Sequence, residues 1–421
     1  MGNTNSCVCH MFSVCIGTSS PHLPAGSASN AVGEVGSESV EQRIEQSKSH
    51  WSHLREFDSD NSSASAEDVD ADNMEVFLSL QAHPSWGNFF PTFGYDTEKW
   101  KSIGSLEIGE KFAEGGQAEL FHVEVTWRKV EYNEWDQEEE CEWVLKVFKK
   151  GTRLRHLQSQ WPHGMLQFTV EQVANVMSPT PKVFPRFFCV IDCGTLLQDG
   201  RFAFLMVKEH LDLRRLIDNK MRLKGANNCG PFSKEKVEKM MFEIAIGMSW
   251  LHSHDIVHRD LKASNILVKV HHDGVFQCFV ADYKCSIGVV GTGLFRAPEI
   301  LEACRDKSVS KRPELFTMAS DVYSNGMTCY EILTGKLPFD GHLEREHIDV
   351  VISGKQPEVP EYVDEWIHKL LSDCWEYDSS KRPSLGEIVN LIYSNSLRIR
   401  KLVDKRSYDI EKIEWINWEV K

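Results

Sequence analysis

His-Arg-Asp-Leu-Lys-Ala-Ser-Asn-Ile-Leu occupies residues 258–267 of this 421-residue chain. The stretch places an aspartate, a lysine and an asparagine close together along the chain. Asp-Tyr-Lys follows at residues 282–284, and Ala-Pro-Glu follows at residues 297–299. One such motif can occur in a sequence by chance. Three motifs in this order are much stronger evidence that the residues work together. They mark the part of the chain that carries its chemistry.

The composition is that of an acidic protein with enough apolar residues for a real core. Apolar residues make up 41% of the chain, and its formal net charge is −15. The length predicts a two-lobed domain of roughly 250 to 300 residues with additional segments. The acidity argues against non-specific nucleic-acid binding, which needs cationic side chains to neutralise phosphates. It fits a signalling protein, or a protein that accepts basic substrates.

The twelve cysteines show no paired metal-ligand spacing. Cys7, Cys9 and Cys15 lie near the N-terminus, and the others are scattered among apolar residues. We therefore expect the scattered cysteines to be buried and reduced, and we expect no structural metal site. No window approaches about 18 consecutive apolar residues, so we expect an intracellular protein without a membrane-spanning helix.

The N-terminus, Met-Gly-Asn-Thr-Asn-Ser-Cys, matches the pattern for N-myristoylation of Gly2. A single acyl chain binds a membrane only weakly, so a stable anchor needs a second signal. Palmitoylation of Cys7 or Cys9 would supply it. The alternative is a disordered terminus that begins Met-Gly by chance. The lipidation hypothesis predicts a protein held peripherally at the cytoplasmic face of the plasma membrane or of endomembranes.

Composition divides the N-terminal third into three parts. Residues 1–16 form the lipidation-type terminus. Residues 17–82 are rich in small and acidic residues, and we expect a disordered tether there because such a segment buries too little apolar surface to offset its ordering entropy. Aromatic residues return in residues 83–105, which we expect to flank a folded domain.

The order of the expected elements predicts the α+β class. Residues 106–112 and 119–127 alternate as strands do, and an acidic stretch separates them from a third strand at 143–149. Long helical patterns dominate later, as at 237–252 and 321–333. Strands first and helices later is the α+β arrangement.

From about residue 106 to residue 397, the sequence resembles a eukaryotic protein kinase domain of the Ser/Thr type. The resemblance implies a two-lobed kinase fold, with a small β-rich N-lobe at 106–207 and a larger, mainly helical C-lobe at 210–397. The tail would comprise residues 398–421. Cys374-Trp375 and the segments 320–324 and 381–384 are similar to the tyrosine-kinase-like branch. The resemblance also implies protein substrates, with ATP and Mg²⁺ or Mn²⁺ as cofactors.

The resemblance assigns catalytic roles to residues of the motifs. Asp260 would accept or orient the proton of the substrate hydroxyl, and Lys262 is the form typical of Ser/Thr kinases. Asn265 and Asp282 would each hold a magnesium ion. Thr292 would bond to the catalytic aspartate and lysine.

The nucleotide is expected to lie between the N-lobe strands and the catalytic loop. Lys146 would contact the α- and β-phosphates, and Glu171, the only acidic residue between Lys150 and Asp192, is its expected partner. The other expected ATP contacts come from the glycine-rich turn and the adenine slot: Ala113, Gly115, Gly116, Ala118, Leu120, Val144, Met206 and Leu267.

A last group of residues would support the site. The resemblance implies that Glu299 pairs with Arg382 in the large lobe, and that Asp321 lies on the central helix that anchors the catalytic loop. His258 and Arg259 belong to that loop, and Tyr283 takes the place of the phenylalanine beside the metal.

The sequence departs from the kinase pattern at five positions, one of which is Val144 in place of the small alanine usual above the adenine ring, a change that narrows the nucleotide slot. Ala113 and Ala118 replace two glycines of the glycine-rich loop, although Gly115 is kept. Backbone N–H groups bind the phosphates, so alanine leaves these donors in place. Tyr283 and Lys284 replace phenylalanine and glycine, and the lysine adds a positive charge near the metal.

Two hypotheses therefore stand. The first is an active Ser/Thr kinase, because every residue expected to touch charge in the transfer step is present. The second is a pseudokinase that acts as a membrane-tethered scaffold or as a nucleotide-gated binding module.

Overall fold

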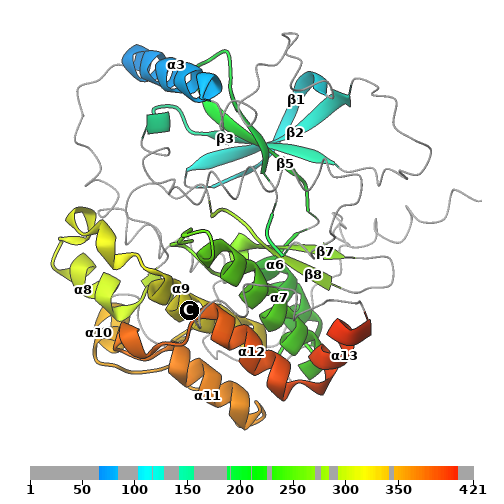
Figure 1. The fold of residues 1–421 in the computed structure, drawn as a ribbon, viewed down its shortest axis with the longest axis vertical. Helices are drawn as coiled ribbons and strands as arrows, with labels where there is room; N and C mark the ends of the chain where they lie inside the picture. Colours follow the sequence, from blue (N-terminus) through cyan, green and yellow to red (C-terminus); the bar gives the residue numbers. More distant parts are fainter. Residues whose placement is uncertain are drawn as a thin grey trace, which may run out of the picture. The chain divides into compact units, whose positions relative to one another are not determined.

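The structure is a computed structural model that describes the folded core of the chain. The described residues are 66–83, 103–115, 117–127, 142–155, 187–189, 191–209, 211–224, 230–270, 276–283, 293–340 and 346–405. Within them the strands of the larger sheet come first and most helices follow, so the predicted α+β class is confirmed (Figure 1).

The N-lobe is built on an antiparallel sheet with the strand order β1-β2-β3-β5-β4. Its strands are β1 (Ile103–Glu114), β2 (Ala118–Trp127), β3 (Trp143–Phe148), β4 (Ile191–Leu196) and β5 (Phe202–Val207). Side chains alternate between the two faces of β3, and both faces are buried. Val144 and Phe148 belong to one apolar cluster, whereas Leu145 and Val147 belong to another.

The helix α3 (Ala66–Ala82) corrects the expected tether at 17–82. Its last part is a helix whose apolar face is buried, and Val76, Phe77 and Leu80 join the β3 cluster that contains Phe148. Average composition concealed this face because exposed polar residues separate the apolar ones in the sequence. Spacing along the helix, rather than composition, decides burial here.

The C-lobe combines a small sheet with a set of helices. The sheet consists of β6 (Leu211–Asp212), β7 (Ile266–Val270) and β8 (Phe276–Val280). The helices are α6 (Leu213–Lys224), α7 (Lys234–His252), α8 (Pro298–Arg305), α9 (Met318–Thr334), α10 (His347–Ile352), α11 (Glu365–Cys374), α12 (Leu385–Asn395) and α13 (Leu397–Lys405).

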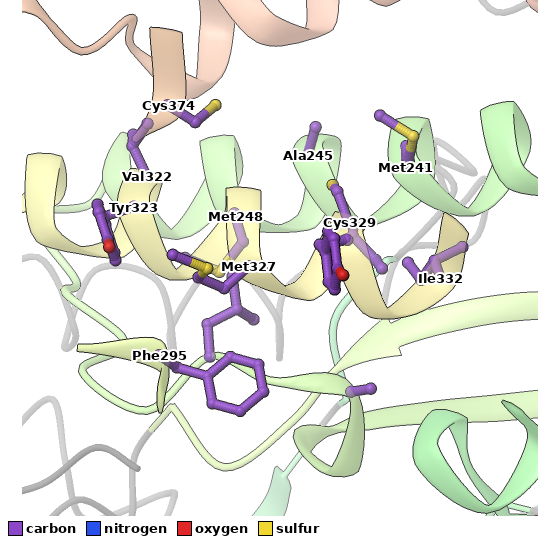
Figure 2. Packing of buried hydrophobic residues seen from close by; sticks show 14 of the residues in the cluster. Met241, Ala245, Met248, Phe295, Val322, Tyr323, Met327, Cys329, Ile332 and Cys374 are labelled. Carbon is purple, nitrogen blue, oxygen red and sulfur yellow. The ribbon is translucent and has the colours of Figure 1, made fainter. Parts of the chain in front are cut away.

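Helix α9 is the central element of the C-lobe core and is buried along almost its whole length. It begins at a capping box formed by Thr317 and Ser320. It ends at Gly335, whose positive φ of 76° suits glycine. Figure 2 shows side chains of α9, such as Met327, packing beside Met248 of α7. Because α9 is buried along almost its whole length, it can hold the catalytic loop in place.

Residues 398–405, which the sequence analysis placed in the C-terminal tail, belong to helix α13. Ile399 in α13 is buried in the C-lobe core. The Ser396 hydroxyl, just before α13, donates to Glu238 Oε2 of α7 at 2.6 Å. The segment as far as Lys405 therefore packs on the C-lobe, and residues 406–421 lie outside the described residues.

The expectations for cysteines and membrane helices can be checked over the described residues. Six described cysteines are buried, as expected: Cys189, Cys193, Cys278, Cys304, Cys329 and Cys374. None of the described helices has the length and apolarity needed to cross a bilayer. Gly2, Cys7 and Cys9 lie outside the described residues.

Candidate active site

Asp260, Lys262 and Asn265 form one hydrogen-bonded unit in the catalytic loop. Lys262 Nζ lies 2.9 Å from Asp260 Oδ2. Asn265 Nδ2 donates to the Asp260 carbonyl at 2.6 Å and to Asp260 Oδ2 at 3.1 Å. The short 3₁₀ turn Ala263–Asn265 brings the asparagine back toward the aspartate. The three predicted residues are therefore together, and Asp260 is held in one orientation.

Asp321 of α9 anchors this loop, as predicted. Its two carboxylate oxygens accept from the backbone N–H groups of His258 (2.7 Å) and Arg259 (2.9 Å). His252 Nε2 lies 3.0 Å from Asp321 Oδ2, a contact that the sequence analysis missed. Charge-assisted hydrogen bonds to backbone donors are stronger than neutral ones, and Asp321 is almost fully buried. The loop is thus fixed to a C-lobe helix that is buried along almost its whole length.

His258 connects the catalytic loop with the strand that leads to Asp282. Asp260 N donates to His258 Nδ1 at 3.3 Å, so Nδ1 is the acceptor in this arrangement. The proton is then assigned to Nε2, which donates to the Ala281 carbonyl at 2.8 Å. The buried imidazole therefore couples the positions of Asp260 and Asp282.

Two residues of the site adopt left-handed backbone conformations. Arg259 has a φ of 71° and Asp282 a φ of 67°. Such conformations are uncommon for residues with a Cβ and cost of order 1–3 kcal/mol when the surrounding structure imposes them. The bonds that Asp321 and Lys146 make to these residues help to hold them there. Two of the five non-glycine residues with a positive φ in the described part of the chain are therefore residues that the motifs predict to be functional.

Lys146 of β3 binds the carboxylate of Asp282 across the site. Its Nζ lies 2.7 Å from Asp282 Oδ1, and the lysine side chain is mostly buried. Burial raises the pKa of Asp282, but the charge and hydrogen bond of Lys146 outweigh this and hold the pKa below its usual value. The ion pair therefore persists at neutral pH. Glu171, the predicted partner of Lys146, lies outside the described residues.

Both the ring and the hydroxyl of Tyr283, the residue after Asp282, make contacts in the core. The ring is buried and makes an edge contact with Phe188. Its hydroxyl donates to the Cys189 carbonyl at 2.8 Å. The expected condition for replacing phenylalanine, a partner for the hydroxyl, is met. Lys284 lies outside the described residues.

Tyr283→Phe is expected to lower the free energy of unfolding by about 1 kcal/mol, because it removes one buried hydrogen bond and leaves the ring in place. Tyr377→Phe is the matched control, since it removes a hydroxyl bond to Glu302 at an exposed site. Chemical denaturation of the three proteins measures the difference. A loss for Tyr283→Phe no larger than for Tyr377→Phe would show that the buried bond does not hold the motif.

The residues expected to line the adenine slot are apolar and lie close together. Ala118, Val144 and Met206 lie in one buried cluster, and Leu267 packs against it. The cluster also contains Ala281, which the sequence analysis missed, although its place directly before Asp282 is a usable signal. The methyl group of Ala118 thus contributes to the core. A glycine-to-alanine change here adds apolar contact and need not disturb the fold.

The glycine-rich hairpin closes in register between β1 and β2. Ala113 lies opposite Leu120, and Leu120 lies opposite Lys146 of β3. Gly115 N donates to the Ala118 carbonyl at 2.7 Å, and a Cβ on Gly115 would meet only ordinary contacts. Gly116 lies outside the described residues. The hairpin therefore forms although two of its expected glycines are alanines.

Asn265 and Asp282 supply the oxygen donors that a divalent ion such as Mg²⁺ prefers. The Asp282 side chain is 39% exposed, which leaves it accessible to a ligand. Within the described ranges, no group of three or more His, Cys, Asp or Glu side chains is placed to hold a metal. The donor set fits an ion that also takes ligands from nucleotide phosphates and water, as Mg²⁺ usually does.

Comparison with known proteins agrees with this geometry. Residues 126–392 match the sequence model of the family described as protein tyrosine and serine/threonine kinase. This chain belongs to that kinase family. The match begins within β2 and ends in α12, so α3, β1 and α13 lie outside it.

Three relatives illustrate the similarity. The serine/threonine-protein kinase STY46 of Arabidopsis thaliana is 35% identical over 171 residues, which cover 38% of this chain and 27% of that protein. A light-sensor protein kinase of Ceratodon purpureus is 32% identical over 204 residues, 42% of this chain and 15% of that protein. A probable serine/threonine-protein kinase of Dictyostelium discoideum is 35% identical over 161 residues, 36% of this chain and 11% of that protein. The matched segments thus span about a quarter or less of these relatives.

The predicted ion pair of the kinase C-lobe is present. Arg382 donates from Nη1 and Nη2 to the two oxygens of Glu299, each at 2.8 Å. The same guanidinium donates to the carbonyls of Ala319, Glu376 and Tyr377. The pair therefore ties the start of α8 to α9 and to the segment before α12.

A second buried ion pair holds the catalytic loop and was not predicted. Glu331 of α9 accepts from the Ala263 backbone N–H at 3.1 Å and pairs with Arg214 of α6 at 2.9 Å. Burial raises the pKa of Glu331, and Arg214 opposes that rise. The sequence holds one signal for this pair: Arg214 and Glu331 each stand among apolar residues of a helix. Charges in such positions need a partner of opposite sign.

The predicted catalytic threonine, Thr292, lies outside the described residues. Its role therefore stays a prediction.

Proposed function

We propose that this protein is an ATP-dependent protein kinase that transfers the γ-phosphoryl group to Ser or Thr hydroxyls of protein substrates. The observation that carries the proposal is the single hydrogen-bonded unit formed by Asp260, Lys262 and Asn265. The Lys146–Asp282 ion pair, which lies next to the adenine slot, supports it.

The chain's residues would share the work of the transfer step. ATP supplies the phosphoryl group, and a divalent ion neutralises charge on its phosphates. Asp260 orients the substrate hydroxyl and accepts its proton, while Lys262 stabilises negative charge beside it. Lys146 binds phosphate oxygens, and Asn265 and Asp282 hold metal. Because most of this catalysis is positioning, the fixed catalytic loop is its main requirement.

The scaffold hypothesis rests on departures from the kinase pattern, and two of them are accommodated. The Tyr283 hydroxyl has a hydrogen-bond acceptor, and the Ala118 methyl group is buried in an apolar cluster. Neither change removes a charged group from the site. These observations favour catalysis over a role as scaffold alone.

The test is phosphorylation by the purified full-length protein, with a generic basic protein as substrate. We expect labelling that requires ATP and Mg²⁺ or Mn²⁺, with phosphoserine or phosphothreonine as the product. Lys262 and the relatives named as serine/threonine kinases support that residue preference. Phosphotyrosine as the sole product would contradict the assignment.

We also propose that the protein is attached peripherally to the cytoplasmic face of a membrane. The support is the myristoylation pattern at Gly2 together with nearby Cys7 and Cys9. The acidic segment that follows offers no cluster of basic residues to replace a second acyl chain.

Gly2→Ala is expected to release the protein into the cytosol, because it removes the acceptor of the first acyl chain. The double change Cys7→Ser and Cys9→Ser is expected to leave weak, exchanging attachment to internal membranes. Imaging and fractionation of cells measure both. A Gly2→Ala protein that stays on the membrane would show that lipidation does not place it there.

A further inference from the structure

Helix α3 lies before the residues that match the kinase family, yet one of its faces is as buried as that of a core helix. The buried apolar side chains recur at helical spacing: Val69, Val76, Phe77 and Leu80. Leu80 is 2% exposed. Val76, Phe77 and Leu80 belong to a buried apolar cluster of the N-lobe.

The contact lies on the side of the sheet that carries the catalytic lysine. Side chains alternate along β3, so Val144, Lys146 and Phe148 share one face. Val144 and Phe148 cluster with the buried residues of α3. Leu145 and Val147, which point to the opposite face, belong to a separate cluster. Helix α3 therefore packs, chiefly beside β4, on the side of the sheet to which β3 presents Lys146.

Asn73 binds this helix to the main chain of the N-lobe. It is 2% exposed, in the middle of the buried face. Its Nδ2 donates to the carbonyls of Thr152 (3.0 Å) and Gly200 (3.2 Å), and its Oδ1 accepts from Leu154 N at 2.7 Å. Asparagine is a weak helix former, so its presence here is explained by these three bonds rather than by propensity.

The turn between β4 and β5 approaches α3 so closely that it has room only for a glycine. Gly200, in the turn between β4 and β5, has a φ of 78°, and a Cβ there would lie 2.5 Å from Asp70 Cγ. A larger residue would therefore push the helix away. Asp72 adds an ion pair with Arg155 at 2.6 Å, which lies at the surface and contributes little by itself.

We propose that α3 is a positioning element of the nucleotide site and that Asn73 is its positioning residue. Asn73 fixes Thr152 and Leu154, which come a few residues after the end of β3 at Phe148. Fixing this segment holds β3, and with it the Lys146 ammonium, at the phosphates. The inference rests on the proposed kinase function and adds a helix outside the family match to its machinery.

The experiment uses the full-length protein and its Asn73→Ala variant, which leaves the buried carbonyls and N–H without the amide. The KM for ATP, kcat and the Kd of Mg²⁺-ATP from calorimetry are measured well below the melting temperature. We expect Asn73→Ala to raise both the KM and the Kd about fivefold, because small displacements of a positioning group cost binding and rate.

Two controls separate positioning from stability. Leu78→Ala changes the exposed face of the same helix, where the side chain is 55% exposed, and should leave the KM within about twofold of wild type. Val389→Ala weakens the core of α12, far from the site in the sequence, and should lower the melting temperature without changing the KM. If Asn73→Ala does not fold, Leu80→Val replaces it, with an expected rise in the Kd of about threefold.

The outcomes distinguish a failure of the proposed role of α3 from a failure of the kinase proposal. An Asn73→Ala protein that melts lower but keeps the wild-type KM and Kd would show that α3 only stabilises the fold, and the kinase proposal would stand. A wild-type protein that neither binds Mg²⁺-ATP nor labels a substrate would overturn the kinase proposal and this inference together.

Discussion

Asp260→Asn is expected to lower the rate of phosphoryl transfer by about a hundredfold or more, the usual contribution of a positioned general base. The amide cannot take the proton of the substrate hydroxyl. Its oxygen can still accept from Lys262 and Asn265, so the loop should keep its geometry. Initial rates with labelled ATP, at saturating nucleotide, measure the effect on kcat.

Asp306→Asn is the matched control for this change. It makes the same replacement at an exposed position after α8 and should keep the wild-type rate. Melting curves for both variants should agree with that of wild type. Equal weak labelling by all three proteins would mean that Asp260 carries no catalysis, and it would support the scaffold hypothesis instead.

Arg382→Met is expected to lower the free energy of unfolding by about 3–5 kcal/mol, because it leaves the Glu299 carboxylate without its buried partner. The variant also removes donors from the carbonyls of Ala319, Glu376 and Tyr377. Methionine replaces most of the volume, so the loss reports the hydrogen bonds and charge more than a cavity. Urea denaturation followed by fluorescence measures it.

Arg398→Met provides the comparison at the surface. Its partner, Glu235, is about half exposed, and exposed pairs contribute between 0 and about 1 kcal/mol. Similar losses for the two variants would show that the Glu299 pair is no more important than a surface contact.

The catalytic loop was predictable because its residues are neighbours in the sequence. Asp260, Lys262 and Asn265 can meet only through local geometry, and the motif specifies that geometry. The roles of Asp321 and Arg382 followed from the resemblance, which supplies long-range partners that no local pattern contains. The structure shows the contact of Asp321 with the catalytic loop and the pair between Arg382 and Glu299.

The long-range contacts that hold the site in place were not predictable from local sequence patterns. The Tyr283 hydroxyl meets a carbonyl 94 residues away, and a backbone acceptor leaves no mark in the sequence. Glu331 lies 68 residues from the N–H that it holds. Helix α3 was missed because a four-residue apolar stripe around one asparagine is diluted by polar neighbours.

The three hydrogen bonds of the Asn73 amide all run to main-chain atoms. The contact can therefore survive when the sequences of related kinases diverge. Substitutions at Thr152 and Leu154 alter side chains but leave the carbonyl and N–H that the amide recognises. Gly200 is different, since both its φ and its closeness to Asp70 restrict it. Related kinases that keep this helix should therefore show an asparagine and a distant glycine that vary together, even where the surrounding sequence has lost all visible similarity.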